Sequence, residues 1–457
     1  MYFRLDIEEP TIEIVQALIE KYDNTREQRL QDYYDGRHDI LNRTFDDKSK
    51  PNNKIVTNFC KYITNVSVGN FIGVPVSYSS QDEEYMKRLQ DILDYNDEQQ
   101  HNASLARTAS IQSRAFEILY TTVDENGDLQ IRFEELDPNE QNVILVYGRS
   151  IEKNLIMAIR FFTCEDILTN ETTTEIYVYT KDKIYEYVKD DSDLHFIGEE
   201  EHYFDDVPIN VYWNKQEGGK GDFEDIISLN DAYNLLQSDD INESNYTNDA
   251  YLIIKNMVAD KEKLDEMKQS RAIQGTDDGE VRWLIKDIND SWKENLKTRI
   301  VHDIHKTSGV PDLTDEQFAG NVSGVAMKYK LLPFENNRSQ KERQFKKALQ
   351  RRIKLITNIL NKQGHNYDYR SVQMTFKPNL PTNEKEEIEG VVSLYGTGLV
   401  SKDTLRNKLS MVEDASLEEE KIKREQEGDI YTIQSILDEE EGDGLSEQEV
   451  LEVAEDE

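Results

Sequence analysis

Two amphipathic helices around one short loop, within the stretch Ser291–Asn361, constrain the fold of this chain more than any other feature. Gly309 and Pro311 end the first helix, because glycine accepts a helix-ending conformation and proline cannot continue the hydrogen-bond ladder. A loop of residues 312–322 follows, and Ser323 is placed to cap the second helix. Both helices carry an apolar stripe at helical spacing. The stripes consist of Trp292, Leu296, Ile300 and Ile304, and of Phe345, Leu349, Ile353, Ile356 and Leu360.

The second helix is basic on its other faces, although the chain as a whole has a net charge of −38. Two interpretations remain open. Either these side chains lie in solvent or pair with the abundant acids, or some of them face nucleic acid or neighbouring subunits. The overall charge argues against tight, indiscriminate DNA binding, which requires many Lys and Arg contacts to phosphates. The basic residues are Arg343, Lys346, Lys347, Arg351 and Lys354.

Length and composition favour an elongated protein with more than one domain. A chain of 457 residues is long enough for about two to four domains. Its hydrophobic content of 37% and charged content of 32% suit a molecule with much surface. No run approaches the roughly 18 apolar residues that a membrane helix needs, and the N-terminus does not resemble a signal peptide. Cys60 and Cys164 are far apart and give no disulfide framework, which favours a reducing cytosol.

The first half of the chain predicts helices followed by a block of strands. Asn126-Gly127 is the strongest hairpin signal, because this pair favours the tight turn that joins two antiparallel strands. Gly69–Tyr78 is expected to turn into a strand. Periodicity predicts helices over Thr11–Leu30 (with Thr11 as a cap), Val56–Val68, Asp82–Asp97 and Asn102–Ala115. Alternation predicts strands over Phe116–Val123, Leu129–Phe133, Val143–Tyr147, Leu155–Phe162, Glu175–Tyr179 and Ile184–Val188.

The second half predicts a small unit between two long helices, like a tip between two legs. Phe223 opens the first of these helices, and the helix that begins near Ser291 is the second. The final segment, Asp429–Glu457, holds twelve acidic residues and neither Lys nor Arg, so we expect a disordered or loosely helical tail. The other expected strands are Ala250–Met257, Glu280–Ile285 and Tyr369–Phe376. Short helices are expected over Asp260–Gln269 and, on either side of Tyr395–Gly398, over Asn383–Ser393 and Lys402–Leu409.

The sequence motifs that would indicate an enzyme or a metal site are incomplete. Asp124, Asn126, Asp128 and Glu135 match an EF-hand loop, but its sixth position must be Gly for the sharp turn and is Leu129. Gly219-Lys220 lacks the other residues of a phosphate-binding loop, which indicates a flexible connector. His302 and His305 are spaced to contact one metal ion, yet no acidic or Cys partner completes the set. We therefore expect no enzyme, no cofactor and no metal.

Several motifs, in their order along the chain, resemble the portal proteins of long-tailed double-stranded DNA bacteriophages, in the branch typified by Bacillus phages. The most specific is Ser308-Gly-Val-Pro-Asp312 followed by Phe318-Ala-Gly-Asn-Val-Ser-Gly-Val-Ala326. The match extends from Tyr34 to Phe376 and is weak in the N-terminal helix and after Pro381. The other motifs are Tyr34-Asp-Gly-Arg-His-Asp-Ile40, Pro51-Asn-Asn-Lys-Ile55, Gly69-Asn-Phe-Ile-Gly-Val-Pro-Val76, Gly221-Asp-Phe-Glu224, Asp231-Ala-Tyr-Asn234 and Ser238-Asp239.

The resemblance implies an α+β portal fold that assembles as a ring. Its parts would be a mixed α/β wing, a two-helix stem, a small strand–helix–strand clip, a long kinked helix and a helical crown. The implied boundaries are 1–222 for the N-terminal region and wing, 223–249 and 291–311 for the stem helices, 250–290 for the clip, 312–322 for the tunnel loop, 323–364 for the long helix, 365–381 for a wing strand, 382–428 for the crown and 429–457 for the acidic tail.

The implied function is a channel at one capsid vertex through which double-stranded DNA is packaged and ejected. The chain would then belong to the virion, and to the host cytoplasm during assembly. Its partners would be its own copies in a probable dodecamer, the DNA, the terminase large subunit, the scaffold and major capsid proteins and the head-completion (adaptor) protein, with no membrane. The residues expected to contact DNA are Gln317, Phe318, Gly320, Asn321, Val322 and Ser323 of the tunnel loop, with Lys293, Lys297 and Lys328 as candidate basic residues facing the lumen.

Two other classes of protein remain as alternatives. An acidic cytosolic scaffold or adaptor would account for the charge and the tail, but not for the order of two long helices around a small tip. A carboxylate-metal nuclease would need acids gathered on converging strands. Purified protein seen by electron microscopy separates these classes, because only a portal forms rings with a central hole.

Overall fold

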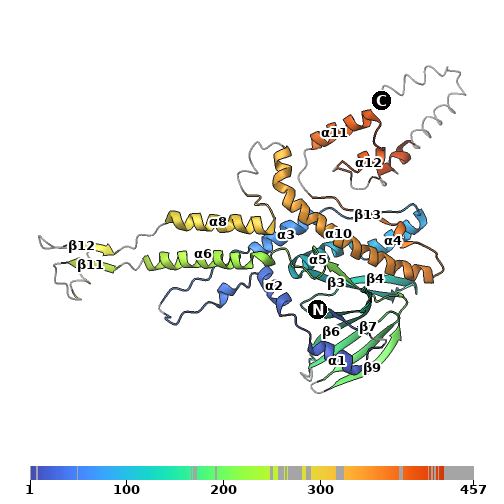
Figure 1. Ribbon diagram of the computed structural model, residues 1–457, viewed down its shortest axis with the longest axis horizontal. Helices are drawn as coiled ribbons and strands as arrows, with labels where there is room; N and C mark the ends of the chain where they lie inside the picture. Colours follow the sequence, from blue (N-terminus) through green and yellow to red (C-terminus); the bar gives the residue numbers. More distant parts are fainter. Residues whose placement is uncertain are drawn as a thin grey trace. The chain divides into compact units, whose positions relative to one another are not determined.

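The computed structural model is an α+β chain that divides into two compact units (Figure 1). The larger unit holds residues 1–73 and 90–369, and the smaller unit holds residues 74–89 and 370–457. The structure describes residues 2–6, 9–48, 50–165, 167, 172–190, 193–247, 251–255, 262, 265, 280–284, 290–314, 324–379, 384–409, 411–412, 415, 418–419 and 421–426.

A six-stranded sheet of order β1-β5-β6-β7-β8-β9 forms much of the larger unit. Its first pair, β1 with β5, is parallel, and the others are antiparallel neighbours along the chain. Helix α1 (Ile12–Glu20) packs Val15 and Leu18 on one face of this sheet. The strands are β1 (Tyr2–Arg4), β5 (Asn142–Tyr147), β6 (Leu155–Glu165), β7 (Thr172–Tyr179), β8 (Lys183–Lys189) and β9 (Leu194–Glu201).

A three-stranded antiparallel sheet, β10-β3-β4, contributes to the core on the opposite face. The predicted hairpin is confirmed, since β3 (Arg114–Val123) pairs with β4 (Leu129–Glu135). Gly127 adopts φ +88°, and Asp124 accepts hydrogen bonds from the backbone N–H groups of Asn126 and Asp128. The residues that resemble an EF-hand loop thus build a turn between strands. Strand β10 (Ile209–Trp213) completes the sheet.

The helices of the first half are more numerous than expected, and their ends differ from the predicted ones. One helix over Thr11–Leu30 is a wrong prediction: α1 ends at Glu20, and α2 (Thr25–Asp35) starts anew. Asp23 separates them, because its carboxylate accepts a hydrogen bond from the Thr25 N–H at 2.9 Å and so favours a turn. The remaining elements are η1 (Asp39–Asn42), α3 (Phe59–Ile72), α4 (Glu83–Tyr95) and α5 (Glu98–Gln112). The boundary between the two units falls within α4, after Leu89.

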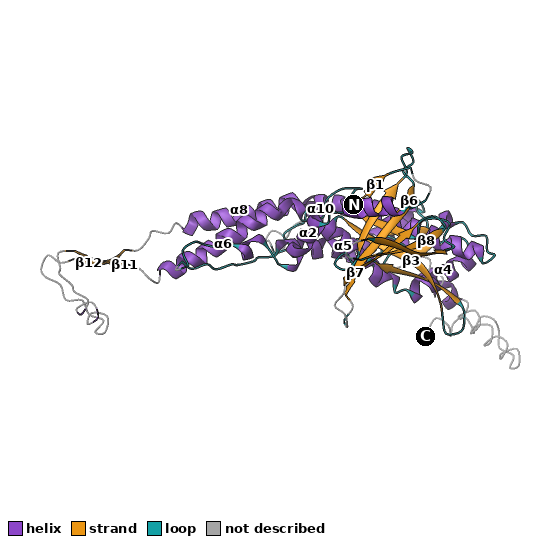
Figure 2. Cartoon of the chain, turned by 90° about the horizontal axis from the view of Figure 1, so that it is seen from below, coloured by secondary structure: helices purple, strands orange, loops and turns teal. Residues whose placement is uncertain are grey.

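Two long antiparallel helices lie side by side in the larger unit, α6 (Ile227–Thr247) and α8 (Asp290–Ser308) (Figures 1 and 2). Helix α6 follows the turn η2 (Glu224–Ile226). The two expected strands between these helices are confirmed as β11 (Tyr251–Lys255) and β12 (Glu280–Leu284), an antiparallel pair. Of the helix expected over 260–269, all but Glu262 and Asp265 lies outside the described residues.

Helix α10 (Gly324–Lys362) is the longest element, with 39 residues. Pro333 lies inside it and removes one backbone donor, a common cause of helix bending. The ribbon of the helix changes direction along its course in Figure 1. The apolar stripe predicted for this segment is confirmed, because Phe345, Leu349 and Ile353 are buried.

The smaller unit contains a two-stranded sheet and short helices. Strands β2 (Ser77–Ser79) and β13 (Gln373–Thr375) pair antiparallel. A continuous strand over Tyr369–Phe376 is a wrong prediction, because η3 (Tyr369–Ser371) precedes β13. The helix expected to end at Ser393 runs on as α11 (Glu384–Thr397), followed by α12 (Lys402–Arg406). The acidic tail, Asp429–Glu457, lies outside the described residues.

Candidate channel site

Helix α8 ends where the sequence predicts, and the chain leaves it through a left-handed glycine. Gly309 has φ +69°, and its N–H donates to the carbonyl of His305. The Asn337 side chain of α10 donates to the Ser308 carbonyl at 3.1 Å. A Cβ atom at position 309 would lie 2.8 Å from the Asn337 amide nitrogen, so both the backbone angle and the contact favour glycine.

His305 fixes the first residues after α8. Its Nδ1–H donates to the Val310 carbonyl at 3.0 Å, and its Nε2 lies 3.8 Å from the Asp312 carboxylate. The imidazole packs edge-on against Phe59 and Tyr62 of α3. His302, the other histidine of the pair considered as a metal site and set aside in the sequence analysis, is exposed. His305 therefore orders the start of the loop. Among the described residues, no group of three or more His, Cys, Asp or Glu could hold a metal ion.

Asp312 begins the predicted tunnel loop with a compact turn. Its carboxylate accepts hydrogen bonds from the Thr314 N–H at 3.0 Å and from the Thr314 hydroxyl at 2.6 Å. Partial burial pulls the pKa of Asp312 upward, but these hydrogen bonds and nearby His305 outweigh burial and lower the pKa below its ordinary value. The expected contact residues Gln317, Phe318, Gly320, Asn321, Val322 and Ser323, and with them the Ser323 cap, lie outside the described residues.

The predicted basic residues Lys293 and Lys297 join α8 to α6. The Lys293 ammonium lies 2.8 Å from the Asp240 carboxylate and also pairs with Glu243. Lys297 lies 2.5 Å from Asp240 and 2.9 Å from Glu294. Hydrogen bonds to Asp240 and Glu243 raise the pKa of Lys293 to about 12. The third candidate, Lys328, is exposed on the first part of α10.

The basic side chains of α10 divide between the two interpretations. The Nη1 and Nη2 groups of Arg351 donate to the Asp206 carboxylate at 2.9 and 3.1 Å. Lys354 pairs with the same carboxylate at 2.8 Å. Pairing with acids is thus confirmed for these two residues. Arg343, Lys346 and Lys347 are exposed. Contact of these three side chains with nucleic acid or with neighbouring subunits stays a prediction.

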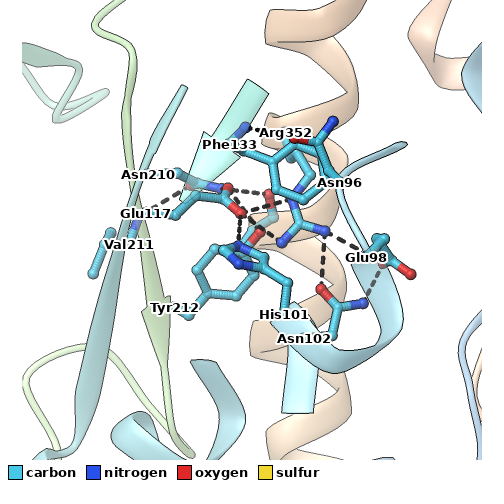
Figure 3. A network of polar contacts seen from close by, with 11 residues as sticks. Asn96, Glu98, His101, Asn102, Glu117, Phe133, Asn210, Val211, Tyr212 and Arg352 are labelled. Atoms are coloured by element: carbon cyan, nitrogen blue, oxygen red, sulfur yellow. Dashed lines mark hydrogen bonds and ion pairs between the residues drawn. The ribbon is translucent and has the colours of Figure 1, made fainter. Parts of the chain in front are cut away.

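The sequence analysis missed a buried arginine on the same helix, Arg352, which is fully enclosed (Figure 3). Its Nε donates to Glu117 of β3 at 2.8 Å, and its Nη1 donates to Asn102 of α5 at 2.9 Å. The guanidinium also lies over the ring of Phe133, 4.4 Å from the centroid. A signal was present: Arg352 falls at helical spacing on the apolar stripe of α10, between Leu349 and Ile356.

Glu117 is the centre of this buried network. Besides Arg352, its carboxylate contacts His101 at 2.8 Å and accepts from the Tyr212 hydroxyl at 3.0 Å and from Asn210 at 3.3 Å (Figure 3). Burial pushes the pKa of Glu117 upward, but the Arg352 guanidinium and His101 prevail and hold that pKa at about 2. The carboxylate is therefore ionised at neutral pH. The network connects α10, α5 and the three-stranded sheet.

A second buried cation, Lys341, lies on the same face of α10, eleven positions before Arg352 in the sequence. It pairs with Asp222, whose carboxylate also lies 3.0 Å from the Lys215 ammonium. Burial pushes the pKa of Asp222 upward, but these two ammonium groups outweigh it and lower the pKa well below its usual range. Asp222 belongs to the Gly221-Asp-Phe-Glu224 motif, so that motif contributes to the attachment of α10.

Comparison with known proteins places these elements in a family. The family model described as "Phage portal protein, SPP1 Gp6-like" matches residues 17–431, from α1 to the helical segment after α12. The chain belongs to this family. The portal protein of Bacillus phage SPP1 is 23% identical in an alignment that covers 96% of this chain and 91% of that protein. The portal protein of Clostridium phage phiCD119 is also 23% identical, over 92% of this chain and 98% of that protein.

Phage portal function follows from this membership, and the resemblance of the sequence to phage portals is confirmed. The family is structural rather than enzymatic, and its members are components of the virion capsid. Within the described parts of the chain, no helix is both long and apolar enough to cross a membrane.

Proposed function

We propose that copies of this chain form a ring, with twelve subunits by analogy with the family, around a channel for double-stranded DNA at one capsid vertex. The match to the phage portal family over residues 17–431 carries the proposal. Helices α6 and α8 are the stem, and the β11–β12 pair belongs to the clip, which meets the head-completion protein. The terminase large subunit docks on the assembled ring during packaging. The scaffold and major capsid proteins surround it.

The charge of the chain supports a channel that passes DNA without holding it. With a net charge of −38 per copy, a ring of copies repels phosphates overall. Of the three lysines proposed to face the lumen, Lys293 and Lys297 are already neutralised by acids of the stem. Lys328, which is exposed, is the better candidate for a weak contact that guides the duplex.

The loop 312–322 is proposed to touch the moving DNA. Its start is held by His305, Asn337 and the Asp312 turn, so motion in the loop need not disturb α8. Gln317 and Asn321 offer neutral contacts that release the duplex as it advances, and Gly320 permits several backbone conformations.

Replacing Gly320-Asn321 by Pro-Pro tests this role. We expect rings of normal size, and procapsids that contain little or no DNA by nuclease protection of the packaged genome. As a control, Pro-Pro can replace Ile151-Glu152, an exposed turn that lies outside the proposed channel. Filled heads from the loop variant would contradict DNA contact by the loop. Failure of the variant to form rings would assign the loop a structural role in assembly instead.

A further inference from the structure

The buried face of α6 is polar, which is unusual for a helix that packs on its own chain. Asn230, Asn234, Ser238 and Asn242 recur every fourth residue and are 0, 0, 0 and 9% exposed. A buried amide or hydroxyl without a partner costs about 1–3 kcal/mol. Four such groups in one stripe therefore require a matching set of partners. We call these four residues the polar ladder.

The partners are backbone N–H groups of residues 53–59, which lead into α3 and which we call the strap; its last member, Phe59, is the first residue of α3, and the Phe59 N–H also donates to the Thr57 carbonyl at 3.1 Å. Each member of the polar ladder accepts a hydrogen bond from one N–H of the strap, and the order is antiparallel to α6. The bonds are Asn53 N–H to Asn242 at 2.8 Å, Ile55 N–H to Ser238 at 2.9 Å, Thr57 N–H to Asn234 at 2.8 Å, and Phe59 N–H to Asn230 at 3.1 Å.

The two repeats match because of elementary backbone geometry. Four residues of an α-helix rise about 6 Å, and two residues of an extended chain advance about 6.6 Å. A side chain at every fourth helix position can therefore meet every second N–H of an extended segment over several repeats. The N–H groups of Lys54 and Val56 alternate with the bonded ones and, within the described residues, donate to no partner.

Neighbouring side chains fix the orientation of the amides. Asn234 donates its Nδ2 to the Nδ1 of His38 at 2.9 Å, and the Nε2–H of His38 donates to the Tyr33 carbonyl at 2.9 Å. The Asn230 Nδ2 donates to the Thr57 carbonyl at 2.9 Å. Both ends of each of these amides are used, so the acceptor oxygen points to the strap.

We infer that the polar ladder is a binding site for an extended polypeptide backbone, and that the strap, by occupying it, sets the position of α6 along its own axis. The site binds the backbone N–H group of every second residue of the strap, and these hydrogen bonds do not involve the strap's side chains. Apolar packing on α6 would let the helix slide with little change in contact. If the polar ladder is displaced, however, the N–H groups of the strap lose their acceptors. The inference does not depend on the channel, because it concerns only contacts within one chain.

Hydrogen exchange at single-residue resolution in the full chain tests the site. We expect slow exchange at the amides of residues 53, 55, 57 and 59 and at least tenfold faster exchange at 54 and 56. Ile55→Pro removes a bonded N–H, whereas the matched control Val56→Pro removes an N–H that the ladder does not use. Ile55→Pro should speed exchange at 53 and 57 at least tenfold, and Val56→Pro by less than twofold.

A second pair of variants changes α6 at Asn242, the most exposed residue of the polar ladder. Asn242→Leu removes the acceptor of the Asn53 N–H and should raise exchange at that amide alone. Asn242→Asp keeps an acceptor oxygen in the same place and should retain the protection. Equal exchange at 53–57 without alternation, equal effects of the two prolines, or equal effects of Leu and Asp at position 242 would each overturn the inference.

Discussion

At the level of single residues, Arg352 attaches α10 to two other elements at once. It is enclosed between Glu117 of β3 and Asn102 of α5, and it stacks on Phe133. Removing one partner of a buried pair leaves the other charge without compensation, which costs far more than losing an exposed pair. The exposed cations of the same helix, such as Arg343, carry no such penalty.

Arg352→Met should lower the free energy of unfolding by about 3–5 kcal/mol, because Glu117 stays buried without its cation. Urea denaturation followed by circular dichroism measures this loss. Arg343→Met, on the exposed face of α10, is the control and should change stability by less than about 0.5 kcal/mol. Adding Glu117→Gln to Arg352→Met should recover part of the loss. Equal effects of the two single variants would refute the role of the buried pair.

The same network predicts a dependence of stability on pH. The pKa of Glu117 is about 2 in the folded chain, despite burial, because of Arg352 and His101, whereas an unfolded glutamate titrates near roughly 4.3. A carboxylate with a depressed folded pKa stabilises the fold above the unfolded pKa, and this contribution disappears as the pH falls through the folded pKa. The stability difference between the natural chain and Glu117→Gln should therefore be constant above pH ~5 and shrink toward pH ~2. A difference that does not change over this range would contradict the assignment.

At the level of elements, periodicity revealed those parts whose apolar residues follow a simple repeat. The hairpin around Asn126-Gly127 and the helices α8 and α10 were predicted because turn chemistry and apolar spacing agree there. Strand β9 was missed because it lies at the sheet edge, where His195–Glu201 is largely exposed and acidic and shows no alternation. Such an edge strand is recognised only through its pairing with β8.

The attachment of these elements was harder to predict than their existence. The buried face of α6 consists of Asn and Ser, so a search for apolar residues does not find it. This polar face is explained only by its hydrogen bonds to the strap, and even the bonded pair nearest in sequence, Phe59 and Asn230, is separated by more than 170 positions. Arg352 likewise donates to Glu117, which lies 235 positions earlier in the sequence. Tertiary pairing of polar residues at such separations leaves no local pattern in one sequence.

Gly221 connects the Gly221-Asp-Phe-Glu224 motif to α5 by close approach of two backbones. A Cβ atom at this position would lie 2.4 Å from the Ile111 carbonyl oxygen and 2.8 Å from that of Ser110. Gly221→Ala should therefore displace the segment that presents Asp222 to Lys341 and lower the melting temperature by several degrees. Gly69→Ala in α3 meets open space and is the control, since alanine there favours the helix by about 0.5–1 kcal/mol. A melting temperature unchanged by Gly221→Ala would show that the backbone adapts.

At the level of the whole molecule, the proposed channel requires that copies of the chain assemble. The chain combines a net charge of −38 with a family match over most of its length, and helices α6 and α8 are joined by ion pairs in which Lys293 and Lys297 take part. Large apolar side chains of α8 and α6, such as Trp292 and Leu235, are exposed in a single copy. Neighbouring copies in a ring would cover them.

Electron cryomicroscopy of the purified protein, alone and with the scaffold protein, shows whether copies of the chain assemble into a ring. We expect closed rings of one symmetry with a central hole wide enough for a DNA duplex, and helices α6 and α8 around it. Particles that remain single chains of 53.3 kDa under both conditions, or oligomers without a central hole, would contradict it.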